Sequence, residues 1–114
     1  MKNYEYTKSI SSKEIDYLMS AALQGMGYWA DGVHIVQHPD FPAPEDLDVS
    51  EALTQKRKWN IAIHDSQEDK WRVLSLKKLL RGLSLTDNLD LENYDMYDAE
   101  RVVQRALFGK EVYA

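Results

Sequence analysis

Cysteine is missing from this chain of 114 residues, and its absence excludes disulfides, thiolate nucleophiles and cysteine-ligated zinc. Long apolar runs are missing as well, since no stretch approaches the roughly 18 residues that a membrane-spanning helix needs. The first residues, MKNYEYTK, lack the apolar region of a secretory signal. We therefore expect a cytoplasmic protein with no membrane partner.

Known catalytic signatures are also lacking. There is no G-x-S-x-G turn, no glycine-rich phosphate loop ending in Lys-Ser/Thr and no H-E-x-x-H motif. Histidines stand at 34, 38 and 64, but their spacing matches no metal signature. Pro39 further argues against a helix that would bring the first two together. The sequence predicts a protein that is not an enzyme, with no catalytic residues, no cofactor and no metal site.

Positive charge is in deficit, because 14 Lys and Arg residues face 19 Asp and Glu residues, a formal net charge of −5. Direct binding to duplex nucleic acid is therefore not expected. The stretch DNLDLENYDMYDAE, residues 87–100, contains no basic residue. Its six carboxylates are Asp87, Asp90, Glu92, Asp95, Asp98 and Glu100. This acidic segment carries −6, so the rest of the chain sums to +1.

The apolar fraction of 44% is sufficient for one core, and we predict a single domain over residues 1–114. Polarity patterns predict strands at 3–10, 33–37, 58–65 and 70–76, with a hairpin loop at 66–69 and an edge strand at 110–114. All three prolines fall in an acidic surface loop at about 38–50. The predicted class is α+β, a small mostly antiparallel sheet of about five short strands with two or three helices on one face.

Capping signals place the helices. Ser11 and Glu14 form a capping box before an apolar stripe that runs from Ile15 to Met26. Gly25 or Gly27 is expected to close this helix in the left-handed conformation. Two further helices are predicted, one over 75–83 capped by its first serine and one over 95–108 that Gly109 ends.

The segments AALQGMGYWADG and YDAERVVQRALFGKEVYA resemble small, mostly uncharacterised proteins of bacteriophages and prophages. In that group a helix ends in Gly before an aromatic pair, and the C-terminus reads acidic helix start, Gln, Ala-Leu-Phe-Gly and a strand ending Tyr-Gly. The matching residues are Tyr28, Trp29, Asp98, Gln104, Ala106, Leu107, Phe108, Gly109 and Tyr113, while Ala114 departs from the pattern. The resemblance covers roughly the first third and last sixth of the chain. It implies an accessory protein of host takeover or counter-defence, and it transfers no catalytic residues.

Together, the resemblance and the acidic segment predict a non-enzymatic protein that binds and inhibits a host protein, plausibly an anti-CRISPR-like factor. An acidic surface with interleaved tyrosines can occupy a basic, DNA-binding groove of its target. The residues assigned to this surface are Asp87, Asp90, Glu92, Tyr94, Asp95, Tyr97 and Asp98. Charges that only solvate a connector and a helix N-terminus are the alternative interpretation.

A second hypothesis is an oligomeric sponge, in its simplest form a homodimer, that sequesters a nucleotide immune signal. Its aromatic residues would stack on the base and its basic residues would hold phosphates. The set is Tyr28, Trp29, Lys56, Arg57, Trp59, Lys77 and Arg81. Against it, we expect one ring of the Tyr28–Trp29 pair to be buried, and we expect Trp59 and Trp71 to meet across the hairpin within the core.

Overall fold

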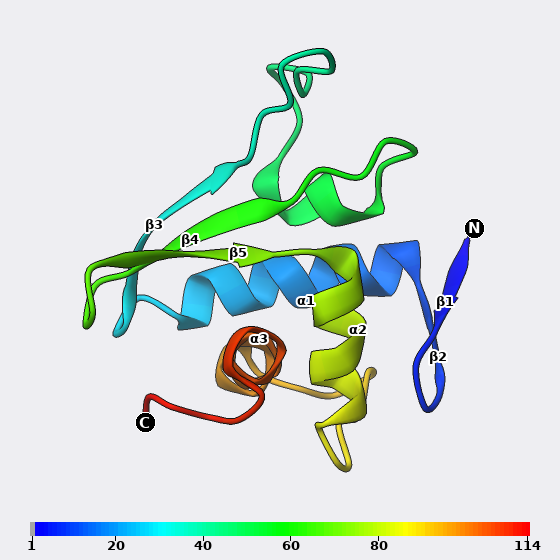
Figure 1. The fold of residues 1–114 in the computed structure, drawn as a ribbon. Helices are drawn as coiled ribbons and strands as arrows, with labels where there is room; N and C mark the ends of the chain where they lie inside the picture. Colours follow the sequence, from blue (N-terminus) through cyan, green and yellow to red (C-terminus); the bar gives the residue numbers. More distant parts are fainter. Residues whose placement is uncertain (1) are drawn as a thin grey trace.

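The computed structural model describes residues 2–114 and shows two antiparallel sheets with helices, which confirms the predicted α+β class (Figure 1). In chain order the elements are β1 (Asn3–Glu5), β2 (Ser9–Ser11), α1 (Ser12–Gly25), β3 (Ala30–Ile35), the 3-10 helix η1 (Val49–Thr54), β4 (Ile61–Asp65), β5 (Lys70–Leu74), α2 (Leu76–Ser84) and α3 (Met96–Phe108). No helix within residues 2–114 is long and apolar enough to cross a membrane.

The strands divide into a β1–β2 hairpin and a three-stranded sheet of order β3-β4-β5. The hairpin predicted between β4 and β5 is confirmed, with residues 66–69 as its turn. Two predicted strands are wrong. Residues 3–10 turn back on themselves, pairing Tyr4 with Ile10, and residues 110–114 form no strand. The latter segment bonds to a side chain instead of to a sheet edge.

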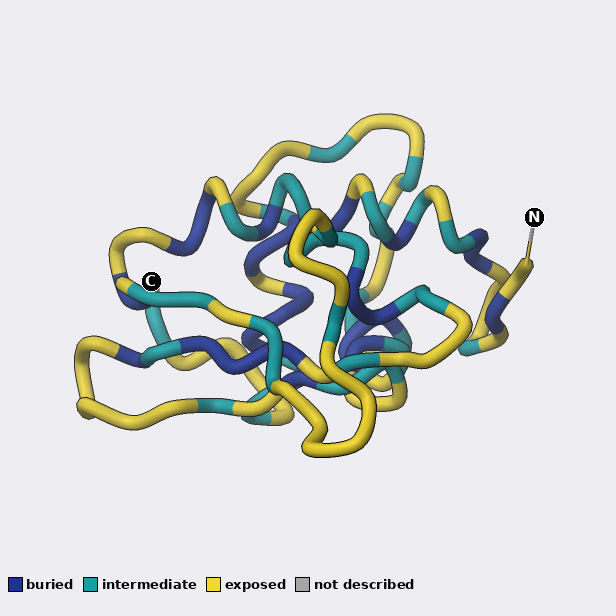
Figure 2. Tube along the Cα trace, turned by 90° about the horizontal axis from the view of Figure 1, so that it is seen from above, coloured by how far each residue is buried: buried dark blue, intermediate teal, exposed yellow. Residues whose placement is uncertain are grey.

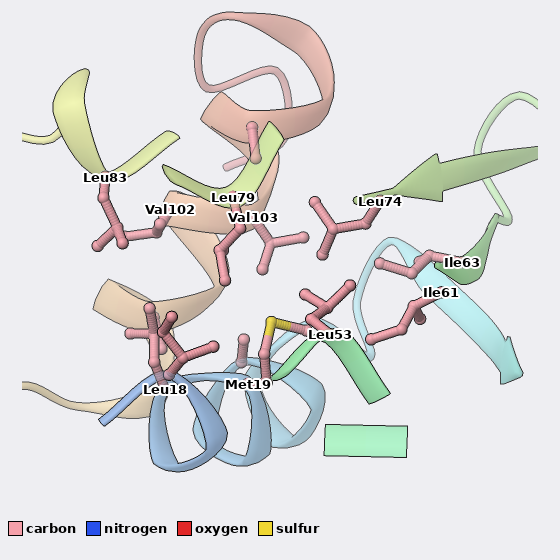
Figure 3. Packing of buried hydrophobic residues seen from close by; sticks show 14 of the residues in the cluster. Leu18, Met19, Leu53, Ile61, Ile63, Leu74, Leu79, Leu83, Val102 and Val103 are labelled. Carbon is pink, nitrogen blue, oxygen red and sulfur yellow. The ribbon is translucent and has the colours of Figure 1, made fainter. Parts of the chain in front are cut away.

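In Figure 1 the three α-helices lie on one side of the three-stranded sheet: α1 runs beneath the sheet, α3 lies below α1, and α2 runs from the end of β5 past α1 to the level of α3. The core between them draws on every layer, as Figure 3 shows for Met19 of α1, Leu53 of η1, Ile63 of β4, Leu79 of α2 and Val103 of α3. Buried positions follow these elements, whereas the connecting loops are mostly exposed (Figure 2). Burial of such apolar side chains is the main term that stabilises the fold.

The start of α1 is confirmed and its end is corrected. Ser11 Oγ accepts from Glu14 N at 3.1 Å while Glu14 Oε1 accepts from Ser11 N at 3.0 Å, which completes the capping box. Neither Gly25 nor Gly27 adopts a positive φ. Gly25 is needed for a different reason, because a Cβ there would lie 2.4 Å from the carbonyl oxygen of Met96. It lets α1 approach the start of α3.

The predicted caps of α2 and α3 are also present. Ser75 Oγ accepts from Lys78 N at 3.2 Å, and Gly109 ends α3 with a left-handed φ of 78°. Besides its apolar residues, α3 buries two polar side chains, Glu100 and Gln104, which lie one helical turn apart. These two residues organise the site described below.

The expected contact between Trp59 and Trp71 is wrong. Trp71 pairs with His64 near one end of the hairpin, whereas Trp59 precedes β4 at the other end. Trp71 is 52% exposed, and the inward positions of β5 belong to Arg72 and Leu74. On this inward face the Arg72 guanidinium reaches Asp65 Oδ2 at 3.1 Å, and Leu74 is fully buried.

Candidate functional site

The acidic segment begins in the connector between α2 and α3 and runs into the first turns of α3. Leu89, Leu91 and Tyr94 are half-buried and pack against the hydrophobic core. Burial raises the pKa of the Tyr94 hydroxyl. On the outer side the carboxylates of Asp87, Asp90, Glu92 and Asp95 are exposed. The connector is therefore an anchored loop that displays carboxylates to solvent.

Local hydrogen bonds fix the shape of this connector. Asn88 adopts a left-handed φ of 63°, a conformation that asparagine tolerates better than most residues. Asp90 Oδ1 accepts from Glu92 N at 2.9 Å. Asp95 Oδ1 accepts from Asp98 N at 2.8 Å, and Asp98 returns a bond to Asp95 N at 3.2 Å. Asp95 and Asp98 thus cap α3, and they also suit the positive end of its dipole.

A hollow of about 350 Å³ lies beside the connector and is lined by both acidic and basic side chains. Its lining includes Asp87, Asp90, Tyr94, Asp98, Arg101, Arg105 and Glu111. Both arginines are already paired, because Glu111 bonds Arg101 at 3.3 Å and Arg105 at 3.0 Å. Within residues 2–114, Asp87, Asp90 and Glu92 form no ion pair. Their charge remains available to a partner.

The sixth carboxylate, Glu100, is fully buried and has a structural task. It accepts from Tyr28 Oη at 2.7 Å, from Trp29 Nε1 at 3.4 Å and from Gln104 Nε2 at 2.6 Å. Burial, together with the bond to Glu100, raises the pKa of Tyr28 to about 12, so this phenol stays protonated and donates. Both side chains of the Tyr28–Trp29 pair that follows α1 thus donate hydrogen bonds to one buried carboxylate of α3.

The two rings of that pair, which lie in the turn between α1 and β3, differ in burial. Trp29 is fully buried, while Tyr28 remains 41% exposed. The indole of Trp29 stacks on the Tyr113 ring at 5.4 Å between centroids and meets Phe108 edge-on at 6.1 Å. Trp29 therefore has no face free for a nucleotide base.

The residues of the sponge hypothesis do not converge in this structure. Trp29 O accepts from Ser66 N just past the C-terminal end of β4, whereas Trp59 lies before its N-terminal end. Trp59 Nε1 donates to Phe41 O at 3.0 Å, and the Arg57 guanidinium covers the Phe41 ring at 3.8 Å. These two contacts tie down the Pro-rich loop.

The basic residues of the same hypothesis lie apart from the aromatic pair. Arg81 reaches from α2 to Ala106 O of α3 at 3.4 Å. Lys56 is exposed before β4, and Lys77 is exposed on the first turn of α2. The residues assigned to the sponge hypothesis therefore lie on several elements and do not line one pocket.

Histidines take separate roles. His64 lies between the carboxylates of Asp31, at 2.5 Å, and Asp69, at 2.8 Å, and hydrogen bonds to both raise its pKa. His34 contacts the exposed Trp71 ring, and His38 stacks on Phe41 in the Pro-rich loop. Among residues 2–114 no group of three or more acidic or histidine side chains is arranged to hold a metal ion.

Sequence reasoning missed the cluster around Gln104. Tyr28, Trp29, Gln104, Phe108 and Tyr113 contact one another directly in the structure. Their spacing of up to 85 residues hides this contact from any local pattern. Comparison of the chain with protein-family models, curated proteins and solved structures found no match.

Proposed function

We propose that this chain is a non-enzymatic binding protein that uses its acidic segment to occupy a basic, nucleic-acid-binding surface of another protein. The resemblance to phage proteins makes a host defence protein, such as a CRISPR effector, the proposed target. The observation that carries the proposal is the display of Asp87, Asp90 and Glu92, exposed and without ion pairs, on an anchored connector.

Order in the connector favours binding. Because the apolar side chains and the capping box already hold its backbone, docking costs less conformational entropy than folding a flexible acidic tail. Tyr97, 45% exposed on the first turn of α3, adds an aromatic surface beside the carboxylates. Aromatic anchors within a charged rim are typical of the residues that dominate binding energy. The carboxylates then steer association with a basic target.

The experiment compares two variants of equal charge. The first carries Asp87→Asn, Asp90→Asn, Glu92→Gln and Asp95→Asn, in which asparagine keeps the helix cap at 95. The matched control carries Asp40→Asn, Glu45→Gln, Asp46→Asn and Asp48→Asn in the Pro-rich loop, where all four carboxylates are also exposed. Both variants change the net charge from −5 to −1.

Each protein is immobilised and used to capture proteins from a bacterial lysate, which are identified by quantitative mass spectrometry. We expect the wild type and the loop control to retain the same target, with the acidic variant associating at least about tenfold more slowly at low salt. The captured target should also lose its affinity for DNA when the wild type is bound. Equal capture by all three proteins, or no specific capture by any, would show that the acidic segment is not the binding surface.

A further inference from the structure

The last five residues, which follow α3 and Gly109, belong to no helix or strand. Gly109, with a φ of 78°, turns the chain back toward α3, and a side chain placed there would meet nothing within 4 Å. Lys110, Glu111 and Ala114 are exposed. Only Tyr113 of this C-terminal segment, residues 110–114, packs against the hydrophobic core.

Gln104 holds the backbone of the segment through both polar atoms of its side-chain amide. Its Oε1 accepts from the amides of both Val112 and Tyr113 at 2.8 Å, and its Nε2 donates to Tyr113 O at 3.1 Å. Glu100 fixes the orientation of this amide through a 2.6 Å bond. On the segment these contacts use main-chain atoms only, and the side chain of Glu111 adds ion pairs with Arg101 at 3.3 Å and Arg105 at 3.0 Å.

Tyr113 supplies the selective contact. Its ring stacks on Trp29 and meets Phe108 edge-on at 5.9 Å, and its hydroxyl donates to Asp65 Oδ2 at 2.6 Å. Asp65 is fully buried, and Arg72 together with two backbone amides of the following turn also bonds it. The bond to Asp65, with burial, raises the pKa of Tyr113 to about 12, so the hydroxyl remains a donor.

A pocket that ends in a buried carboxylate distinguishes tyrosine from phenylalanine, since phenylalanine would leave one oxygen of Asp65 without this donor. The side chain of Val112, which precedes Tyr113, is 44% exposed. The surroundings of Tyr113 therefore resemble a site for one tyrosine side chain of a peptide.

We propose that the pocket between Trp29, Gln104 and Asp65 is a binding site for a tyrosine-bearing peptide segment. The chain's own C-terminal segment occupies it in this structure, and the same segment supplied by a separate molecule can replace it. Detachment breaks no backbone–backbone hydrogen bond of residues 110–114 and leaves every strand pair and helix intact, which is typical of regions that open locally.

The test uses the full chain with a protease site inserted between Gly109 and Lys110, cut after folding. The nicked protein then holds residues 110–114 without a covalent link. A labelled peptide of sequence GKEVYA is added, and native mass spectrometry follows replacement of the original segment. We expect saturable one-to-one exchange. A peptide with Phe in place of Tyr should bind at least about tenfold more weakly, because a hydrogen bond to a charged group is lost.

Controls distinguish specific recognition of tyrosine from nonspecific binding of the peptide. Replacing the Lys and Glu of the peptide with Ser should change binding only a few-fold, and Asp65→Asn in the protein should reduce the preference for Tyr over Phe. If the nicked protein loses stability when the segment leaves, the peptide should raise its melting temperature in a concentration-dependent way. Neither exchange nor stabilisation at millimolar peptide, or equal binding of the Tyr and Phe peptides, would overturn the proposal.

Discussion

Replacing Gly82 with alanine should destabilise the protein even though alanine is the better helix former. Gly82 lies within α2 where that helix crosses α3. A Cβ at this position would stand 2.5 Å from Val102 O, 2.8 Å from Ala106 N and 2.8 Å from Ala106 Cβ. Two of these three atoms are backbone, so no rotamer change can relieve the contacts. The helices must move apart by about 1 Å to restore normal van der Waals distances.

The magnitude follows from two opposing effects. Alanine gains about 1 kcal/mol of helix propensity over glycine. Overpacking a filled core costs about 1–3 kcal/mol, and rigid backbone contacts place Gly82→Ala at the upper end of that range. The net loss is therefore about 2 kcal/mol. With an unfolding entropy of roughly 2.1 cal/mol/K per residue, a chain of this length loses about 8 °C of Tm.

Thermal unfolding followed by circular dichroism measures this loss, with Gly27→Ala as the control. Gly27 has no positive φ, and an added Cβ would meet nothing within 4 Å. Gly27→Ala should leave Tm unchanged or raise it slightly. If Gly82→Ala proved as stable as the wild type, the close α2–α3 crossing described here would be wrong. Since α2 and α3 carry the two ends of the connector, its anchoring would then need revision as well.

Two further predictions test individual side chains. Trp29→Ala should cost about 3–5 kcal/mol of unfolding free energy, because this side chain is fully buried. Trp71→Ala, on the exposed sheet face, should cost less than about 1 kcal/mol. Urea titration measures both losses, and equal losses would contradict the assigned burial. His64 contributes stability that is complete below its ordinary pKa of 6.5 and is lost as pH rises through its raised folded pKa. The stability difference between wild type and His64→Gln should therefore shrink from pH 5.5 to pH 9, and a constant difference would refute the ionic role of Asp31 and Asp69.

Structural features that depend on residues close together in the chain could be predicted from the sequence. The Ser11–Glu14 capping box, the Ser75 cap and the left-handed Gly109 each depend on residues at most four apart, and all are present. Alternation in β5 predicted the strand, but the expectation that Trp71 faces the core was wrong. The period of two is the same for either face, and Asp65, the partner of the inward Arg72, belongs to another strand.

The candidate site likewise has features that the sequence predicts and features that it does not. The charge of the acidic segment is a property of composition, so the sequence shows it directly. That Glu100 is buried while Asp87 is exposed depends on donors brought from the end of α1 and from Gln104. The C-terminal segment was predicted as a strand because its composition suits one, yet its partner is a glutamine side chain, which no strand pattern encodes.

Glu111 connects the two proposed sites. It belongs to the C-terminal segment, and it neutralises Arg101 and Arg105, which line the hollow beside the acidic connector. When the segment detaches, both arginines lose this partner and face Asp87 and Asp90 across the hollow. The surface offered to a basic target then becomes less negative, because Glu111 leaves and the arginines can pair with the exposed aspartates. Occupancy of the tyrosine pocket by the segment that carries Glu111 would therefore favour the charge pattern on which the proposed binding through the acidic segment depends.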